Sequence, residues 1–270
     1  MTLPSPPDSP LLCLDAGNTS VHGAVLRGSE RLASLRLARQ AAESPVVLGA
    51  ALRDMLRRCA LSEPLAGAAV SVRPELNDCL RKAAEPLLSG PLHFVAHSDS
   101  PIEIRYRPPS SVGMDRLCNA VAVNARFQGR LPALAVDFGT ATKFDLVAHD
   151  GAYEGGAIAP GLFSAFEGLV GAASLLKSID LVAPDSPIGH STAESLGSGF
   201  ILGLAALTDG MVARFSAAAG SRLVCVATGG YAARITRYCS TPMPVDELLT
   251  LRGVQLLWEW RQRGASRSSS

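Results

Sequence analysis

The sequence has few aromatic residues and almost no excess of charge. Aromatic side chains make up 5% of the 270 residues while hydrophobic residues make up 47%, so a core must be built mainly from Leu, Val and Ala. The 25 basic and 24 acidic side chains leave a net charge of +1. This balance gives no electrostatic reason to expect a nucleic acid or an acidic membrane surface as a partner.

The sequence also lacks paired cysteines and a targeting segment. Its six cysteines include no C-x-x-C pair and lie mostly in apolar segments, which predicts reduced thiols in the core of a cytoplasmic protein. The N-terminus lacks the basic start and apolar run of a signal peptide, and no uninterrupted apolar stretch approaches a membrane span. We therefore expect a cytoplasmic location and no membrane partner.

What the sequence does contain is one pattern that occurs twice, as LLCLDAGNTSVHGAVL and as ALAVDFGTATKFDLV. When Asp15 is aligned with Asp137, Gly17 falls on Gly139, and hydroxyl or amide residues follow in both copies. Each copy predicts an apolar strand that ends in a carboxylate, a tight glycine turn, and a second strand that returns beside the first.

A turn of this kind suits a phosphate and its metal ion. The glycine allows close approach of the backbone, the N–H and hydroxyl groups donate to phosphate oxygens, and the aspartate offers a hard oxygen to a cation. Two facing copies would form a nucleotide cleft.

The chain divides into two similar halves, predicted at 11–110 and 111–262, with loose termini at 1–10 and 263–270. In the first half we expect strands at 11–15, 21–27, 31–38, 67–72 and 92–96 and helices at 45–60 and 74–88. In the second half we expect strands at 133–137, 143–148, 154–158 and 222–227 and helices at 161–176, 192–219, from about 229, and at 245–262. Three adjacent strands followed by alternating helices and strands predict an α/β fold with a mixed sheet flanked by helices, made twice.

The join near 108–131 has the apolar spacing of a helix, with Ser110 or Ser111 as its N-cap. Asp115 and Asn119 are four residues apart and therefore share one helix face. A polar helix face is usually only solvated, but a position at the seam of two halves favours ligand binding.

Two histidines close to the join are weaker candidates. His93 and His97 are four apart in a segment that we expect to be a strand, where they lie too far apart for easy shared ligation. Because no third ligand is nearby, the spacing does not favour a zinc site.

Five ordered motifs together resemble the type III pantothenate kinase family, over nearly all of the chain from Leu11 to about Trp260. They are DAGNT at 15–19, VGMDRLCNA at 112–120, DFGTAT at 137–142, EGGAIAPG at 154–161 and TGGYA at 228–232. The resemblance implies the actin, sugar kinase and heat-shock ATPase superfamily, whose duplicated ribonuclease-H-like halves match the internal repeat.

The resemblance also implies roles for individual residues. The ATP-binding set would be Asp15, Ala16, Gly17, Asn18, Thr19, Ser20, Val21, His22 and Thr140. The pantothenate-binding set would be Tyr106, Gly113, Met114, Asp115, Arg116 and Thr192. Asp15 would lie near the Mg²⁺ of ATP, Asp137 would bind a monovalent cation, K⁺ or NH₄⁺, and Asp115 would be the proton acceptor.

The implied reaction is transfer of the γ-phosphoryl group of ATP to the primary hydroxyl of pantothenate, the first step of coenzyme A synthesis. An alcohol is a poor nucleophile, so an aspartate within hydrogen-bond reach aligns it and takes its proton. Arg116 would pair with the substrate carboxylate or a phosphate, unless it forms a structural salt bridge. The family also implies a homodimer with a shared active site. Small residues at Ala193, Gly197, Gly203 and Ala206 would permit close packing, either within the fold or across a two-fold axis.

Several positions depart from the family pattern. Ser110 and Ser111 occupy a stretch that often holds a glutamate. Lys143 stands where threonine is common, and it would either lean toward a phosphate or, as we slightly favour, only decorate a strand end. Ser191 replaces an asparagine, and His190 stands where another basic residue is usual.

Alternatives remain open. Taken alone, Asp137 would equally well bind magnesium or cap its turn through Thr140. A nucleotide-binding accessory or regulatory protein on the same fold is a second function, although the intact Asp15, Asp115 and Asp137 argue against it. The G-x-D-R motif disfavours a third, an acetate or sugar kinase.

Overall fold

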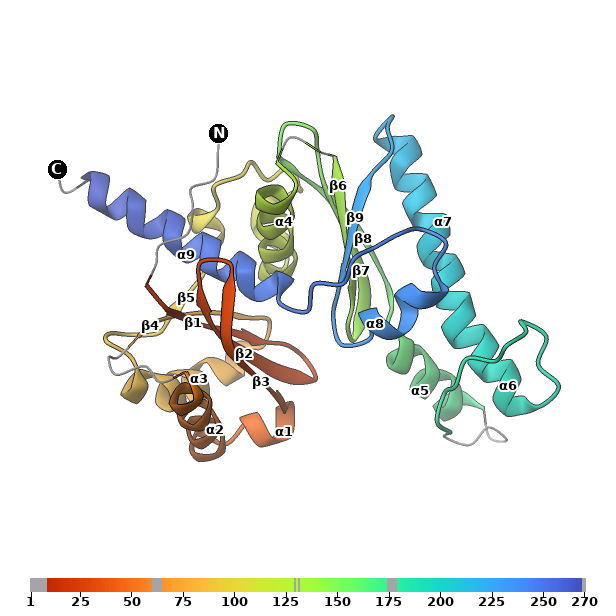
Figure 1. The fold of residues 1–270 in the computed structure, drawn as a ribbon, viewed down its shortest axis with the longest axis horizontal. Coiled ribbons are helices and arrows are strands. Elements are labelled where there is room, and N and C mark those ends of the chain that lie inside the picture. The colour runs from red at the N-terminus through yellow and green to blue at the C-terminus, as the bar shows by residue number, and fades with distance from the viewer. Residues whose placement is uncertain (1–8, 60–64, 129, 131, 174–178, 269–270) are drawn as a thin grey trace. The chain divides into compact units, whose positions relative to one another are not determined.

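The computed structural model describes residues 9–59, 65–128, 130, 132–173 and 179–268. The chain forms two compact units (Figure 1). Unit 1 comprises Met1–Arg126 together with Leu248–Ser270, and unit 2 comprises Phe127–Glu247. Residues 111–126 and 248–262, which we predicted in the second half, belong to unit 1 in this division.

Unit 1 contains a five-stranded mixed sheet in the order β3-β2-β1-β4-β5. The strands are β1 (Leu11–Ala16), β2 (Ser20–Arg27), β3 (Glu30–Ala38), β4 (Ala66–Ser71) and β5 (His93–Phe94). The central strand β1 pairs antiparallel with β2 and parallel with β4, and its apolar residues are almost fully buried. Burial on both faces explains why β1 is a continuous apolar run rather than an alternating one.

The helices of unit 1 are α1 (Arg39–Ala42), α2 (Pro45–Arg58), α3 (Asn77–Ala84), α4 (Met114–Arg126) and α9 (Leu249–Ser268). Helix α4 packs against α9, and α2 packs against α3 (Figure 1). A Cβ atom on Gly253 would lie 2.0 Å from the carbonyl oxygen of Cys118, so α9 and α4 meet backbone to backbone. This contact fixes the C-terminal helix in unit 1. The segment that we predicted as a loose tail from Arg263 is therefore helical up to Ser268.

Unit 2 repeats the design with a four-stranded sheet in the order β8-β7-β6-β9. The strands are β6 (Ala133–Phe138), β7 (Ala141–Val147), β8 (Tyr153–Pro160) and β9 (Val224–Thr228). The helices are α5 (Leu162–Ala172), α6 (Thr192–Gly197), α7 (Gly203–Ala218) and α8 (Ala232–Ile235). In both units the buried strand, β1 or β6, forms a hairpin with the next strand and pairs in parallel with a later one, β4 or β9. A third strand, β3 or β8, pairs antiparallel with the outer strand of the hairpin. The predicted mixed sheet flanked by helices, made twice, is confirmed.

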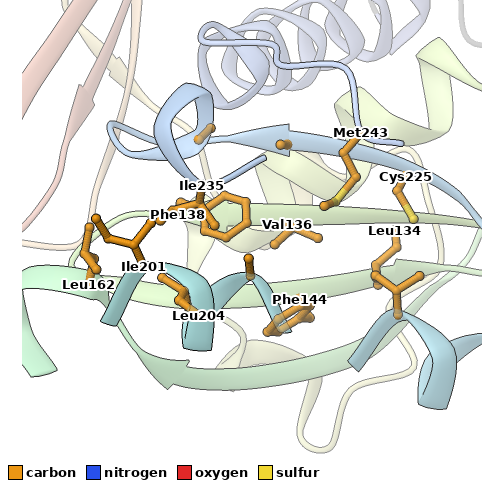
Figure 2. Close-up of a cluster of buried hydrophobic side chains, with 14 of the residues drawn as sticks. Leu134, Val136, Phe138, Phe144, Leu162, Ile201, Leu204, Cys225, Ile235 and Met243 are labelled. Atoms are coloured by element: carbon orange, nitrogen blue, oxygen red, sulfur yellow. The ribbon is translucent and has the colours of Figure 1, made fainter. Parts of the chain in front are cut away.

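The core of unit 2 lies between the sheet and its helices (Figure 2). Leu134, Val136 and Phe138 alternate along β6 and so share one face, where Ile201 and Leu204 from the helical segment meet them. The opposite face of β6 carries Asp137, which places a carboxylate at the end of a strand whose apolar side chains are committed to the core.

Helices α6 and α7 form one continuous helix through a π-helical segment at Ser198–Leu202. The run Thr192–Ala218 is long and apolar enough to span a membrane by length and composition, and its most apolar 18-residue window has a mean hydropathy of 1.5. Polar residues such as Ser198 and Asp209 interrupt this helix, so the expectation that no uninterrupted apolar stretch approaches a membrane span still stands. Core helices of soluble proteins pass the same test, so the property carries little weight on its own.

Candidate functional site

The first glycine turn of the repeat joins β1 to β2 in unit 1. The N–H of Gly17 donates to the carbonyl of Ser20 over 3.0 Å, and the carbonyl of Thr19 accepts from the N–H of Arg39 over 2.9 Å. The turn is thus braced from both sides, while the side chains of Asn18 and Thr19 are exposed. These two residues are well placed to meet a ligand.

The other members of the first turn differ in what they can offer. Ala16 and Val21 are fully buried, so they can contact a ligand only through their backbone. Asp15 is half-buried at the end of β1, directly opposite His22 in the strand pairing. Burial, followed by the charges of Arg36 and Arg31, lowers the pKa of His22 from 6.5 to about 4. His22 is therefore neutral near pH 7 and adds no charge beside Asp15.

The predicted substrate motif forms the beginning of α4 in unit 1. A Cβ atom on Gly113 would lie 2.6 Å from Oδ1 of Asp115, so the carboxylate folds back toward Gly113 and a larger residue there would have to displace it. Asp115 lies in the first helical turn, where free N–H groups favour an acidic side chain. The buried guanidinium of Arg116 lies over the ring of Tyr106, 5.6 Å from its centroid. Within unit 1, Asp115 therefore lies against Gly113, and Arg116 lies against Tyr106.

The expected N-cap of this helix was wrong. Ser110 and Ser111 do not cap it, because they belong to a 3-10 turn at Pro109–Ser111 and the helix begins only at Met114. The hydroxyl of Ser111 instead donates to the carbonyl of Pro108 over 2.8 Å. Asn119 is not on a solvated face, since it is fully buried and accepts a hydrogen bond from the hydroxyl of Thr250 over 2.9 Å.

A buried polar network lies behind the substrate motif, and the sequence analysis missed it. Nε2 of His97 lies 2.8 Å from the carbonyl of Val112, the residue before Gly113. The buried carboxylate of Asp99 accepts from Nε2 of His93 and from the N–H of Ala96, each over 2.9 Å. The two histidines thus bind neighbouring chain groups rather than a metal. Their only signal in the sequence was the spacing that we assessed for zinc.

The second glycine turn follows β6 in unit 2. Asp137 is 9% exposed, and its Oδ2 lies 2.8 Å from Nζ of Lys143. The two residues are directly opposite in the β6–β7 pairing. Lys143 therefore does not merely decorate a strand end, which was the slightly favoured expectation: it forms an ion pair with the carboxylate that we expected to hold a monovalent cation.

Two other motifs supply the glycines that enclose this turn. Gly229 of TGGYA has a φ of +92°, and a Cβ atom there would lie 2.4 Å from Oδ1 of Asp137. Gly161 of EGGAIAPG lies against the turn itself, since a Cβ atom there would come within 2.2 Å of the carbonyl oxygen of Thr140. That carbonyl accepts from the hydroxyl of Ser164 over 2.8 Å, while Thr140 remains exposed. These motifs are separate in sequence, but the fold brings them together around one turn.

Thr192 is the first residue of α6 in unit 2 and is exposed. Ser191 caps the helix by accepting from the N–H of Glu194 over 3.2 Å, and the N–H of His190 donates to Oε2 of Glu194 over 2.7 Å. His190 and Ser191, which depart from the family pattern, thus both bond to Glu194 and fix the start of the helix that presents Thr192. Thr192 and Thr140 belong to unit 2, whereas the other predicted ATP and substrate residues belong to unit 1.

Metal ligands are sparse. Within the described ranges, no group of three or more His, Cys, Asp or Glu residues could hold a metal ion. A magnesium ion that arrives with ATP needs no such group, because it usually keeps several waters and binds one or two carboxylates plus phosphate oxygens. Asp15 fits that requirement, as a half-buried carboxylate beside a turn with exposed donor side chains.

The sequence is similar to that of known proteins over most of its length. A model of the type III pantothenate kinase family matches residues 11–214. The chain is 37% identical to type III pantothenate kinase 1 of Symbiobacterium thermophilum, over 92% of this chain and 96% of that protein. It is also 37% identical to the type III pantothenate kinase of Thermus thermophilus, over 90% and 96%.

Solved structures support the fold alone. A protein of Campylobacter jejuni, described as a putative Baf family transcriptional activator, aligns with a TM-score of 0.57 at 16% identity, over 93% of this chain and 99% of that one. The ethanolamine utilization protein EutJ of Carboxydothermus hydrogenoformans aligns with a TM-score of 0.52 at 12% identity, over 95% and 92%. The family match and the two sequence relatives show that the chain belongs to the type III pantothenate kinase family.

Proposed function

We propose that this protein transfers the γ-phosphoryl group of ATP to the primary hydroxyl of pantothenate, giving 4′-phosphopantothenate and ADP. The observation that carries the proposal is the beginning of α4, where Asp115 folds over Gly113 and the next residue, Arg116, lies over Tyr106. A nucleotide-binding module has no need of a carboxylate at this position. The relatives that carry the kinase name cover nearly the whole chain.

Asp115 is the proposed proton acceptor. Phosphoryl transfer asks little covalent chemistry of the protein, so its main task is to align the hydroxyl with the γ-phosphorus and to accept the proton as the new O–P bond forms. Asp115 lies in the first turn of a well-packed helix, and its carboxylate is held against Gly113. A carboxylate positioned in this way loses little freedom when the substrate arrives.

Arg116 and Tyr106 are the proposed anchors for pantothenate. The guanidinium fork matches the planar geometry of a carboxylate, and pantothenate carries one carboxylate. Because the Arg116 side chain is buried and lies over an aromatic ring, it can present a fixed rather than a mobile charge. Thr192 would contribute a hydroxyl from the capped start of α6.

The two glycine turns are the proposed phosphate-binding elements. In the first turn the backbone of Ala16 to Val21 and the side chains of Asn18 and Thr19 would donate to phosphate oxygens, and Asp15 would hold the magnesium ion. In the second turn the exposed Thr140 would contact ATP. Magnesium neutralises phosphate charge when it is bound.

The monovalent cation implied by the resemblance does not fit the residues around Asp137. One carboxylate oxygen already contacts the ammonium group of Lys143, and the other faces Gly229, where an added Cβ atom would come within 2.4 Å of it. The proposed mechanism therefore contains no potassium or ammonium ion.

A homodimer in the cytoplasm completes the proposal. The helix Thr192–Ala218 buries only a third of its most apolar window, and its Leu207 is 40% exposed. Gly203 and Ala206 are also exposed on it, whereas a Cβ atom on Gly197 would lie 1.9 Å from the carbonyl of Val182 and so serves packing within the unit. A second copy of the chain is the expected cover for the exposed residues. A light-scattering mass near one chain's 28.1 kDa at micromolar concentration would contradict the dimer.

A coupled ADP-release assay tests the function. ADP should form with ATP, magnesium and pantothenate, and not with a panel of sugars or acetate. ADP release with a sugar or acetate alone would favour another kinase class. Nucleotide binding without turnover on any acceptor would favour an accessory protein.

A further inference from the structure

The ion pair between Lys143 and Asp137 lies on the second glycine turn and has a defined structural origin. The two residues are directly opposite in the antiparallel β6–β7 pairing, so their side chains leave the same face of the sheet. The neighbouring pair, Val136 with Phe144, is fully buried on the other face. A slip by one residue would expose that pair to solvent, so the core holds the register that brings lysine to aspartate.

The ion pair is well shielded from water. The two side chains are only 16% and 12% exposed, and Nζ lies 2.8 Å from Oδ2. A buried carboxylate is costly unless a cation or donor meets it, and the ammonium of lysine is a compact point charge that meets this need. A monovalent metal ion has the same charge and would compete with Nζ for the same oxygen.

We propose that the ammonium group of Lys143 is a built-in monovalent cation at Asp137, so that catalysis by this protein does not require potassium. This inference rests on the proposed kinase function. The lysine neutralises Asp137 beside the turn that carries Thr140, which lets a polyphosphate approach without repulsion from that carboxylate. A potassium ion would have to displace a tethered charge or bring a second positive charge against it.

Turnover of pantothenate should be measured with ATP and magnesium at constant ionic strength, in tetramethylammonium chloride and in potassium chloride. We expect wild-type rates in the two salts to agree within about twofold. Lys143→Met should lose at least tenfold in tetramethylammonium chloride and regain activity in potassium or ammonium chloride, because the ion fills the vacated charge site. Lys143→Arg should remain independent of potassium.

Lys82→Met is the matched control. The Lys82 side chain is 65% exposed and pairs with Asp78 on the surface of unit 1, so its loss should change neither rate nor salt response. Stimulation of the wild type by tenfold or more with potassium would overturn the proposal. Equal rates of Lys143→Met and wild type in both salts would also overturn it.

A thermal unfolding series without substrates keeps the test separate from the proposed function. The midpoint of the wild type should be the same in both salts, whereas that of Lys143→Met should be lower and should rise with potassium. A potassium-specific rise in the wild type would refute the built-in cation even if no pantothenate kinase activity were found. Absence of ADP release in every salt, with the expected midpoints, would refute the kinase function alone. If Lys143→Met does not fold, the wild type and Lys143→Arg still give both readouts.

Discussion

Glu259 is a buried carboxyl group that should make the stability of unit 1 depend on pH. It lies on α9 with 3% of its surface exposed. Burial raises its pKa from 4.5 to about 7, while Gln255 and Arg263 oppose the rise to a smaller extent. The group is therefore neutral in the folded protein under mildly acidic conditions.

The sign and size of the effect follow from proton linkage. Between pH 4.5 and about 7 the folded state holds a proton on Glu259 that the unfolded chain releases, so the free energy of unfolding falls as pH rises. The contribution is fully present below 4.5 and is lost above about 7. A rise of this size corresponds to about 3 kcal/mol. Glu259→Gln removes the ionisation, so its stability relative to wild type should grow by that amount from pH 5 to pH 8.

Fluorescence offers a local assay for this effect. The only two tryptophans of the chain, Trp258 and Trp260, flank Glu259, so their emission reports directly on α9. Urea unfolding of wild type and Glu259→Gln should be followed at pH 5, 6, 7 and 8. The exposed Glu30 on β3 of the same unit supplies the control, because Glu30→Gln should show no such trend. A difference between Glu259→Gln and wild type that stays constant across this pH range would refute the reasoning.

Three further predictions concern the substrate motif and the second glycine turn. Asp115→Asn should reduce kcat on the order of 10²–10⁴-fold while leaving the unfolding midpoint and ATP binding unchanged, and near-normal turnover would remove Asp115 as the proton acceptor. His97→Phe, which loses the hydrogen bond to the loop before Gly113, should raise the KM for pantothenate several-fold more than it lowers kcat. His97→Gln should restore part of the loss, and equal KM values for the two variants would assign His97 a purely structural role. Gly229→Ala should cost about 1–3 kcal/mol of unfolding free energy, because its φ is +92° and Asp137 leaves no room for a Cβ atom. Gly220→Ala is the control in open space with a φ of +65°, and an equal cost in urea unfolding would show that the contact with Asp137 is unimportant.

The sequence by itself determined the repeated architecture, because strand and turn signals are local. An apolar run, an aspartate, a glycine turn and a returning apolar run predict a hairpin wherever they occur, and both hairpins begin within two residues of the predicted positions. The resemblance of five motifs also pointed to the family that the comparisons confirm. Nothing in these signals depends on which distant segments meet.

Contacts between distant segments were decided only by the tertiary structure. The return of α9 to unit 1 depends on the fit of Gly253 against Cys118, two positions far apart in sequence. The same packing buries Asn119, which helical spacing alone placed only on one polar face with Asp115.

The ion pair between Lys143 and Asp137 was also decided only by the tertiary structure, although the two residues are close in sequence. Both strands were predicted, but the exact opposition of Lys143 and Asp137 depends on strand register, and register follows from which side chains the core accepts. A local pattern can specify a strand and its turn, whereas the partner of a side chain depends on packing that involves the whole unit.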